Sequence, residues 1–140
     1  MTDEFVLDPR LAGDSVPVID LPLCSVRLMN DARFAWLLLV PRRVGMSEIH
    51  DLDAVDQDQL WREVRTAARA LRTVSLCDKL NIGALGNMVR QLHVHVVARV
   101  LADAAWPGPV WGSGVAIPYA DAERTIRVDT LRALLAQSMA

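Results

Sequence analysis

The chain has 140 residues, with 15 lysines and arginines against 17 aspartates and glutamates, a formal net charge of −2 and 52% hydrophobic residues. This length is typical of one domain with its own hydrophobic core, so we expect residues 1–140 to form a single domain. The slight excess of negative charge argues against a nucleic-acid groove built on bulk positive charge.

The first part of the chain predicts a short helix followed by three strands. Asp8 and Pro9 form a helix start, with the aspartate as cap and the proline at the first helical position, and Gly13 ends the helix. Strands are expected over 16–20, 23–29 and 34–40, with a hairpin connection at 30–33. These three strands should pair in an antiparallel arrangement.

One long helix is predicted over residues 53–79, after a helix-start signal at Ser47 and Glu48. Its apolar residues recur every three or four positions and form one stripe that packs on the sheet: Leu60, Val64, Ala67, Leu71 and Val74. His50 precedes this helix and is far in sequence from the other two histidines. We interpret His50 as a surface or capping histidine.

Two further strands, over 79–85 and 91–100, complete an antiparallel sheet around a turn at Gly86 and Asn87. Residues 102–112 then break the periodicity, because their two prolines and two glycines suit neither helix nor ladder. A helix over 121–138 closes the chain and buries Leu131, Leu134 and Leu135. The sequence therefore predicts an α+β fold: an antiparallel sheet with one long helix and a C-terminal helix.

The loop at 102–112 holds Trp106 and Trp111, two bulky aromatic side chains. They could wall a nucleobase pocket, or they could anchor the loop on the core or on a second subunit. The sequence leaves both readings open.

Two histidines stand two residues apart in the last predicted strand. Because side chains alternate faces along a strand, Gln91, His93 and His95 should share one face, and Leu92, Val94 and Val96 the other. Two adjacent imidazoles in an apolar setting cost free energy if either is charged and unpaired. A metal, a phosphate or a structural hydrogen-bond network would each explain the pair.

The residues just upstream favour a ligand that approaches the main chain. Gly83 and Gly86 allow sharp turns and close backbone contact, while Asn81 and Asn87 supply neutral donors and acceptors. Together with Gln91, His93 and His95, these residues resemble the histidine-triad (HIT) family of nucleotide hydrolases and transferases. That family carries His-x-His-x-His-x-x on a strand after a glycine-containing loop.

The resemblance covers residues 20–112 and includes the stretch 37–43, which is similar to the family's strand ending in Pro-x-Arg. Gln91 stands where the family has its first histidine, so His93 takes the place of the nucleophile and His95 that of the third histidine. The resemblance implies a HIT-like fold, a homodimer and a nucleotidyl-histidine intermediate, with no metal or cofactor. Its implied substrate-binding residues are Asn30, Asn81, Gly86 and Asn87; a turn asparagine is the alternative for Asn30.

Two rival functions are compatible with the same residues. His93 and His95 could be two ligands of a metal site, although the sequence supplies no third ligand with telling spacing. The fold could also be a non-catalytic nucleotide-binding or interaction module in which Gln91 marks the loss of catalysis. Turnover of an adenosine phosphoramidate or a dinucleoside polyphosphate separates enzyme from module, and metal analysis of the purified protein separates the metal site from both.

The sequence lacks signals of export and of membrane insertion. Met1 is followed by Thr-Asp-Glu rather than by a basic region and an apolar run, and the longest apolar run, 34–41, is too short to span a bilayer. Cys24 and Cys77 show neither metal-type spacing nor the density of a disulfide scaffold. We therefore expect a cytoplasmic protein with reduced thiols and no membrane partner.

Overall fold

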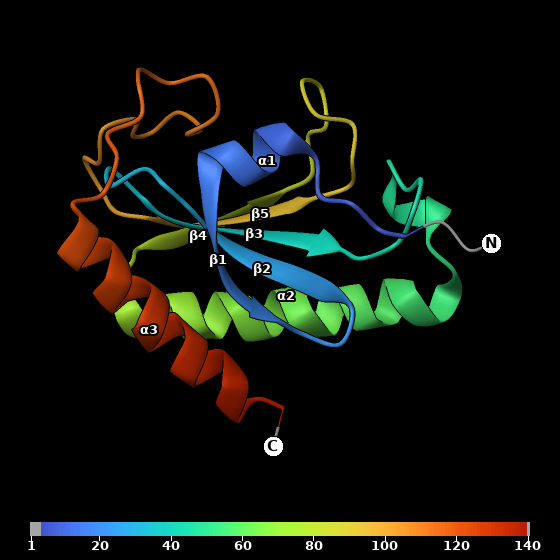
Figure 1. The fold of residues 1–140 in the computed structure, drawn as a ribbon. Helices are drawn as coiled ribbons and strands as arrows, with labels where there is room; N and C mark the ends of the chain where they lie inside the picture. Colours follow the sequence, from blue (N-terminus) through green and yellow to red (C-terminus); the bar gives the residue numbers. More distant parts are fainter. Residues whose placement is uncertain (1–3, 140) are drawn as a thin grey trace.

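The computed structural model describes residues 4–139 (Figure 1). In this part of the chain, five antiparallel strands form a central sheet in the order β1-β2-β3-β5-β4. The strands are β1 (Ser15–Asp20), β2 (Cys24–Met29), β3 (Ala35–Pro41), β4 (Lys79–Gly83) and β5 (Val94–Arg99), and the helices are α1 (Pro9–Asp14), the 3₁₀ helix η1 (Ile49–Asp51), α2 (Ala54–Val74) and α3 (Asp121–Gln137). The α+β fold predicted from the sequence is confirmed.

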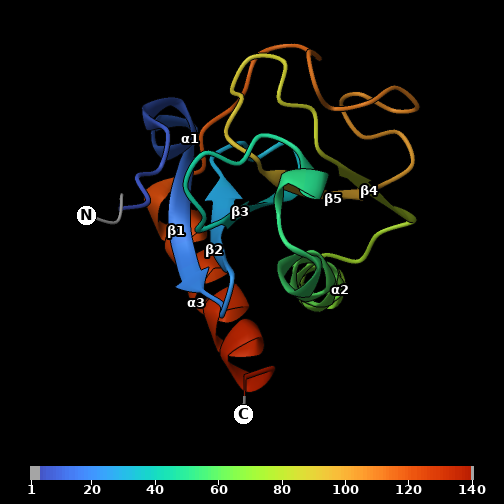
Figure 2. The ribbon, with the colours of Figure 1, turned by 90° about the vertical axis from the view of Figure 1, so that its right-hand side faces the viewer.

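Helices α2 and α3 cover one face of the sheet, and Figure 2 shows them side by side. Six of their side chains are fully or almost fully buried there: Leu60, Val64, Ala67, Leu71, Leu131 and Leu135. Each buried leucine contributes ~1.5–3 kcal/mol relative to an exposed one. The predicted stripes are confirmed apart from Val74 and Leu134, which are half-buried. No helix within residues 4–139 is both long enough and apolar enough to cross a membrane.

Helix α2 is shorter than predicted at its C-terminal end. Asp53 caps its start, because its side chain accepts the N–H of Asp56 at 2.8 Å, but the helix ends at Val74. The chain then joins the sheet: the N–H of Asp78 donates to the carbonyl of Arg99 at 2.9 Å. Residues 75–79, which helical periodicity had assigned to the helix, therefore lead into the pairing with β5 instead.

The opposite face of the sheet is covered by α1 and by the loops at 84–93 and 100–120 (Figure 1). β3 lies between the two layers, so all seven of its residues are buried. Leu37 and Leu39 point toward the helices, whereas Trp36 and Leu38 point toward the loops. This second face, rather than the helix-covered one, holds the histidine pair.

The loop after β5 is anchored by a buried ion pair. Arg99 Nε donates to Asp103 Oδ2 at 2.8 Å, and this hydrogen bond lowers the pKa of Asp103 to about 2. Arg99 Nη1 also donates to Asn81 Oδ1 at 2.8 Å. The guanidinium lies 5.5 Å from the ring centre of Trp106. Trp106 therefore packs on this anchor.

The two strands around the glycine turn are shorter than predicted, and this difference changes the site. β4 ends at Gly83 and β5 begins at Val94, so residues 84–93 form a loop in which Gly86 has a φ of +71°. The N–H of Leu92 donates to the carbonyl of Met46 at 2.9 Å instead of to a neighbouring strand. Strand alternation therefore does not extend back to Gln91.

Candidate active site

His95 is the second residue of β5 and lies on the loop-covered face. Its neighbours in the sheet are Leu38 of β3 and Gly83 of β4. Its ring lies between two tryptophans, with ring centres 5.7 Å away for Trp36 and 5.3 Å away for Trp111. A Cβ atom on Gly83 would lie 3.2 Å from the Trp111 ring, which is a tight contact. The absence of a side chain at Gly83 therefore leaves room for the Trp111 ring beside His95.

A hydrogen bond from Trp36 determines which nitrogen of His95 carries a proton. Trp36 Nε1 lies 3.0 Å from His95 Nδ1. Because an indole N–H can only donate, Nδ1 must accept, and the neutral His95 ring carries its hydrogen on Nε2. Burial, and to a smaller extent the nearby His93, lower the pKa of His95 to about 3. The ring is therefore neutral at physiological pH, with an N–H donor at Nε2.

His93 has the opposite arrangement. It lies just before β5, with its ring centre 4.9 Å from that of His95, and only 6% of the residue is exposed. Its Nδ1 is 2.6 Å from the main-chain carbonyl oxygen of Gln91. A carbonyl oxygen only accepts, so Nδ1 of His93 carries the hydrogen and Nε2 of the neutral ring has a free lone pair.

Gln91 does not present its side chain in the way that strand alternation predicted. Its Oε1 accepts the N–H of Asp8 at 2.8 Å, and its Nε2 donates to the carbonyl of Val6 at 2.9 Å. Both polar atoms of the side chain are therefore used on the N-terminal segment, because residue 91 lies in the loop before β5. The hydrogen bond from His93 is accepted by the main-chain carbonyl of Gln91.

The two histidines line a cavity of about 270 Å³. Trp36 and Trp111 line it as well, and so do Gly86 and Asn87 of the preceding loop. The structure thus brings together four of the residues predicted from the sequence, the two histidines and the Gly-Asn pair. Trp111 belongs to the cavity wall, whereas Trp106 only packs against Arg99.

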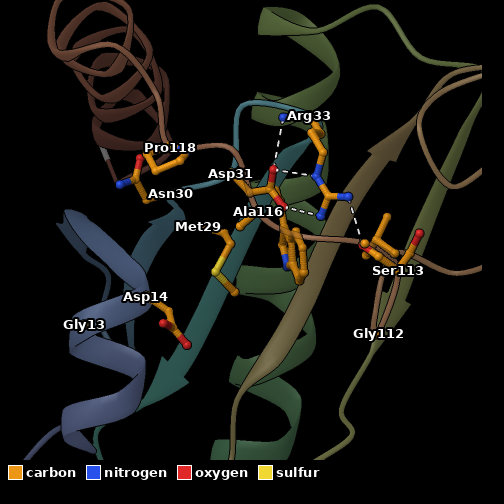
Figure 3. Close-up of a pocket in the computed structure, with 13 residues that line it drawn as sticks. Gly13, Asp14, Met29, Asn30, Asp31, Arg33, Gly112, Ser113, Ala116 and Pro118 are labelled. Carbon is orange, nitrogen blue, oxygen red and sulfur yellow. Dashed lines mark hydrogen bonds and ion pairs between the residues drawn. The ribbon is translucent and has the colours of Figure 1, made fainter.

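A second hollow, of about 430 Å³, shares Trp36, Asp14 and Met29 with this cavity (Figure 3). Arg33 lies in its wall, where it pairs with Asp31 at 2.8 Å and donates to the carbonyl of Ser113 at 2.8 Å. These bonds hold polar groups in fixed positions beside the histidine cavity.

The other predicted site residues have different surroundings. Asn30 lines the second hollow, and its Oδ1 accepts the N–H of Tyr119 at 3.0 Å. Asn81 lies on β4 with its Oδ1 on Arg99, and it lines neither cavity. His50 is exposed on η1, as expected for a surface histidine, and borders a smaller hollow of about 170 Å³ that reaches His93.

Sequence reasoning missed Trp36, which touches His95 directly. A signal was present, because an indole N–H in a strand of otherwise aliphatic residues needs a buried acceptor. Sequence reasoning also considered a metal site. Within residues 4–139, no three His, Cys, Asp or Glu side chains gather closely enough to hold a metal ion.

Comparison with known proteins identifies close relatives of this arrangement. The HIT domain profile matches residues 11–101. A histidine triad protein from Bradyrhizobium japonicum is 47% identical, with a TM-score of 0.93, over 95% of this chain and 99% of that one. One from Sinorhizobium meliloti 1021 is 46% identical, with a TM-score of 0.90, over 92% and 96% of the two chains.

A third solved structure, a histidine triad protein from Marinobacter aquaeolei VT8, is 40% identical, with a TM-score of 0.93, over 96% of this chain and 98% of that one. Among curated proteins, no match to the chain is found. The HIT profile spans all five strands and both histidines of the cavity, and the three solved relatives extend the likeness to nearly the full length. On these grounds the chain belongs to the histidine triad family, whose members are typically nucleotide-binding hydrolases and transferases.

Proposed function

We propose that the protein is a nucleoside phosphate hydrolase or nucleotidyl transferase that works through a covalent nucleotidyl-histidine intermediate on His93. One observation carries this proposal: the two neighbouring imidazoles hold complementary tautomers. His93 has a free lone pair on Nε2, and His95 has an N–H on Nε2. A nucleophile and a hydrogen-bond donor for a phosphoryl group therefore lie side by side.

In the proposed reaction, Nε2 of His93 bonds to phosphorus while the bond from phosphorus to the leaving group breaks. The leaving group keeps the electron pair of that bond. The His93 ring becomes positively charged, and its Nδ1–H bond to the Gln91 carbonyl stabilises that charge. Water, or another acceptor in a transferase, then attacks phosphorus and releases His93. This chemistry requires neither a metal nor a cofactor.

The phosphoryl oxygens need donors that are already in place when negative charge redistributes over them. His95 can supply its Nε2–H without a change of protonation. The loop that carries Gly86 and Asn87 lies in the same cavity and can supply main-chain and amide N–H groups. The hollow that contains Asn30 and Arg33 adjoins this cavity, and we assign the nucleoside to it.

The same hydrogen bonds argue against His95 as the nucleophile. Its Nδ1 already accepts from Trp36, and its Nε2 carries the hydrogen. An attack from His95 would first require a proton to leave or the Trp36 bond to break. Asn81, an expected substrate contact, is better explained as an anchor for Arg99, because its side-chain oxygen is bonded to that guanidinium.

A panel of adenosine phosphoramidate and dinucleoside polyphosphates, followed by mass spectrometry of the protein, tests the proposal. We expect turnover and a nucleotidyl adduct on His93. His93→Ala should abolish turnover and adduct but retain nucleotide binding, whereas Arg69→Ala, a change at an exposed residue of α2, should retain all three. An adduct on His95, or one still formed by His93→Ala, would contradict the assignment. Nucleotide binding without any turnover would favour a non-catalytic module.

We also propose that the protein is a homodimer. The outer edge of β4 has no strand partner among residues 4–139, and exposed apolar side chains lie along or near it: Ile82, 45% exposed, and Leu76, 91% exposed. Such an edge favours pairing with a second chain. Sedimentation should give twice the chain mass, and Ile82→Lys should weaken the dimer more than Ile126→Lys, a matched change on α3. A monomer at all concentrations would refute this proposal.

We further propose that residues 1–140 form one domain and that the protein is cytoplasmic. The main core cluster contains residues from Val18 to Leu135, which supports a single domain. Cys24 and Cys77 are both free thiols, which is compatible with a reducing compartment. Limited proteolysis and cell fractionation test these two statements.

A further inference from the structure

Residues 5–14, called the N-terminal strap below, lie across the loop-covered face of the sheet. Gln91 pairs with the strap at Val6 and Asp8. Arg10 Nη1 donates to the carbonyl of Met88 at 2.7 Å, which ties the strap to the loop that carries Gly86 and Asn87. The strap is thus fastened to the loop before β5 at two separate points.

We propose that Gln91 is a positioning residue: its side chain fastens the N-terminal strap as one wall of the active-site cavity, while its main-chain carbonyl orients His93. The residue at the family's first histidine position would then act through the strap and not on the substrate. As a statement about catalysis this inference rests on the proposed function, but the fastening itself does not.

The chemistry of an amide suits this task. Val6 offers a carbonyl and Asp8 an N–H, so a partner must donate to one and accept from the other. A glutamine side chain has one donor group and one acceptor at its end. It therefore satisfies two main-chain groups of an extended segment, much as a neighbouring strand would. A methionine has nearly the same length but neither polar atom.

The strap contributes directly to the cavity. Leu11, which is 4% exposed, and Asp14 both line the cavity that contains the two histidines. The Asp8 carboxylate is held by Arg10, whose hydrogen bonds lower the pKa of Asp8. Release of the strap would therefore remove a wall of the cavity.

Gln91 links the position of the strap to the orientation of His93. The side chain of Gln91 reaches back to the strap, and its carbonyl is 2.6 Å from Nδ1 of His93. Movement of the strap therefore acts on the peptide that holds the imidazole in its tautomer. A residue with a purely structural role would change the amount of folded protein, but not the access to His93.

Two sets of variants test the proposal in the full chain. Gln91→Met removes both hydrogen bonds and preserves length. Asp8→Ala and Asp8→Pro form a matched pair at the strap: both remove the carboxylate, but only proline removes the N–H, and the Asp8 φ of −56° suits a proline. Combining Gln91→Met with Asp8→Pro should have little more effect than Gln91→Met alone, because Gln91→Met already removes the bond that Asp8→Pro breaks.

Three measurements follow from these variants. In Gln91→Met, the Asp8 amide should exchange hydrogen about 10- to 100-fold faster, the change expected for losing two ordinary hydrogen bonds. Modification of His93 by diethyl pyrocarbonate should accelerate by a similar factor relative to the wild-type protein. In a turnover assay, KM should rise about 5- to 10-fold while kcat changes less.

The results separate the two proposals. If wild-type protein shows no turnover, the proposed function fails. Amide exchange and His93 modification still test whether Gln91 fastens the strap as a wall of the cavity. Unchanged exchange at Asp8 in Gln91→Met would overturn the fastening. Faster exchange without faster His93 modification would overturn the strap as a cavity wall. A lower kcat at constant KM and constant His93 access would mean that Gln91 is only structural, which also overturns the proposal.

Discussion

The hydrogen bond from Trp36 to His95 can be tested with a Trp36→Phe protein. The change keeps an aromatic ring beside His95 but leaves its buried Nδ1 without a donor. An unsatisfied buried acceptor costs ~1–3 kcal/mol, and the space left by the smaller ring adds ~1 kcal/mol. We therefore expect the free energy of unfolding, measured with urea, to fall by about 2–4 kcal/mol unless the ring changes its tautomer.

The tautomer itself is the sharper measurement. A hydrogen bond worth ~1.4 kcal/mol favours one tautomer about tenfold, so its loss should allow the hydrogen of His95 to populate Nδ1. Long-range ¹H–¹⁵N spectra distinguish a protonated ring nitrogen from an unprotonated one. Because part of the population then lacks the Nε2–H donor, we expect kcat/KM to fall by about 3- to 10-fold, less than the loss that follows complete removal of a donor.

Trp111→Phe is the matched control. Trp111 packs on the other side of His95, and its buried Nε1 has no hydrogen-bond partner in the described chain. Removing this N–H should leave the His95 tautomer unchanged and cost less stability than Trp36→Phe. Protonated Nδ1 on His95 in the wild-type protein would refute the reasoning, and so would an unchanged tautomer and unchanged activity in Trp36→Phe.

Two further predictions concern pH and Asn81. The pKa of His95, about 3 in the folded chain, lies below its ordinary value of 6.5, so the unfolded chain binds a proton that the folded chain does not. The free energy of unfolding should therefore decrease as the pH falls below 6.5, by up to ~1.4 kcal/mol per pH unit from this group. In His95→Gln, the free energy of unfolding measured with urea should depend less on pH between 6.5 and 5. Asn81→Ala should lower stability by ~1–3 kcal/mol, because Arg99 loses a buried acceptor, yet leave kcat/KM within about twofold. If Asn81→Ala instead lost activity tenfold without losing stability, Asn81 would have to contact the substrate.

The sequence predicted what depends on local periodicity. The stripe on α2 and the alternation within β5 follow from side-chain spacing, so the sheet, its helix-covered face and the inward position of His95 could be anticipated. The contacts that define the site link distant residues: Trp36 to His95, and Gln91 to Val6. Alternation also failed at Gln91 because the left-handed Gly86 and the contact of Leu92 with Met46 take the chain out of the ladder.

Both faces of β3 are buried, which restricts the substitutions that this strand can accept. Leu37 packs under the helices while its neighbour Leu38 pairs with His95 in the sheet. Interiors are tightly packed, so a gap left by a smaller residue at position 37 would shift the strand and carry that shift to the imidazole. We expect substitutions that alter substrate preference to accumulate in the loops at 84–93 and 100–120, while β3 tolerates only changes that preserve volume. Deep mutational scanning scored separately for abundance and for turnover would reveal this division.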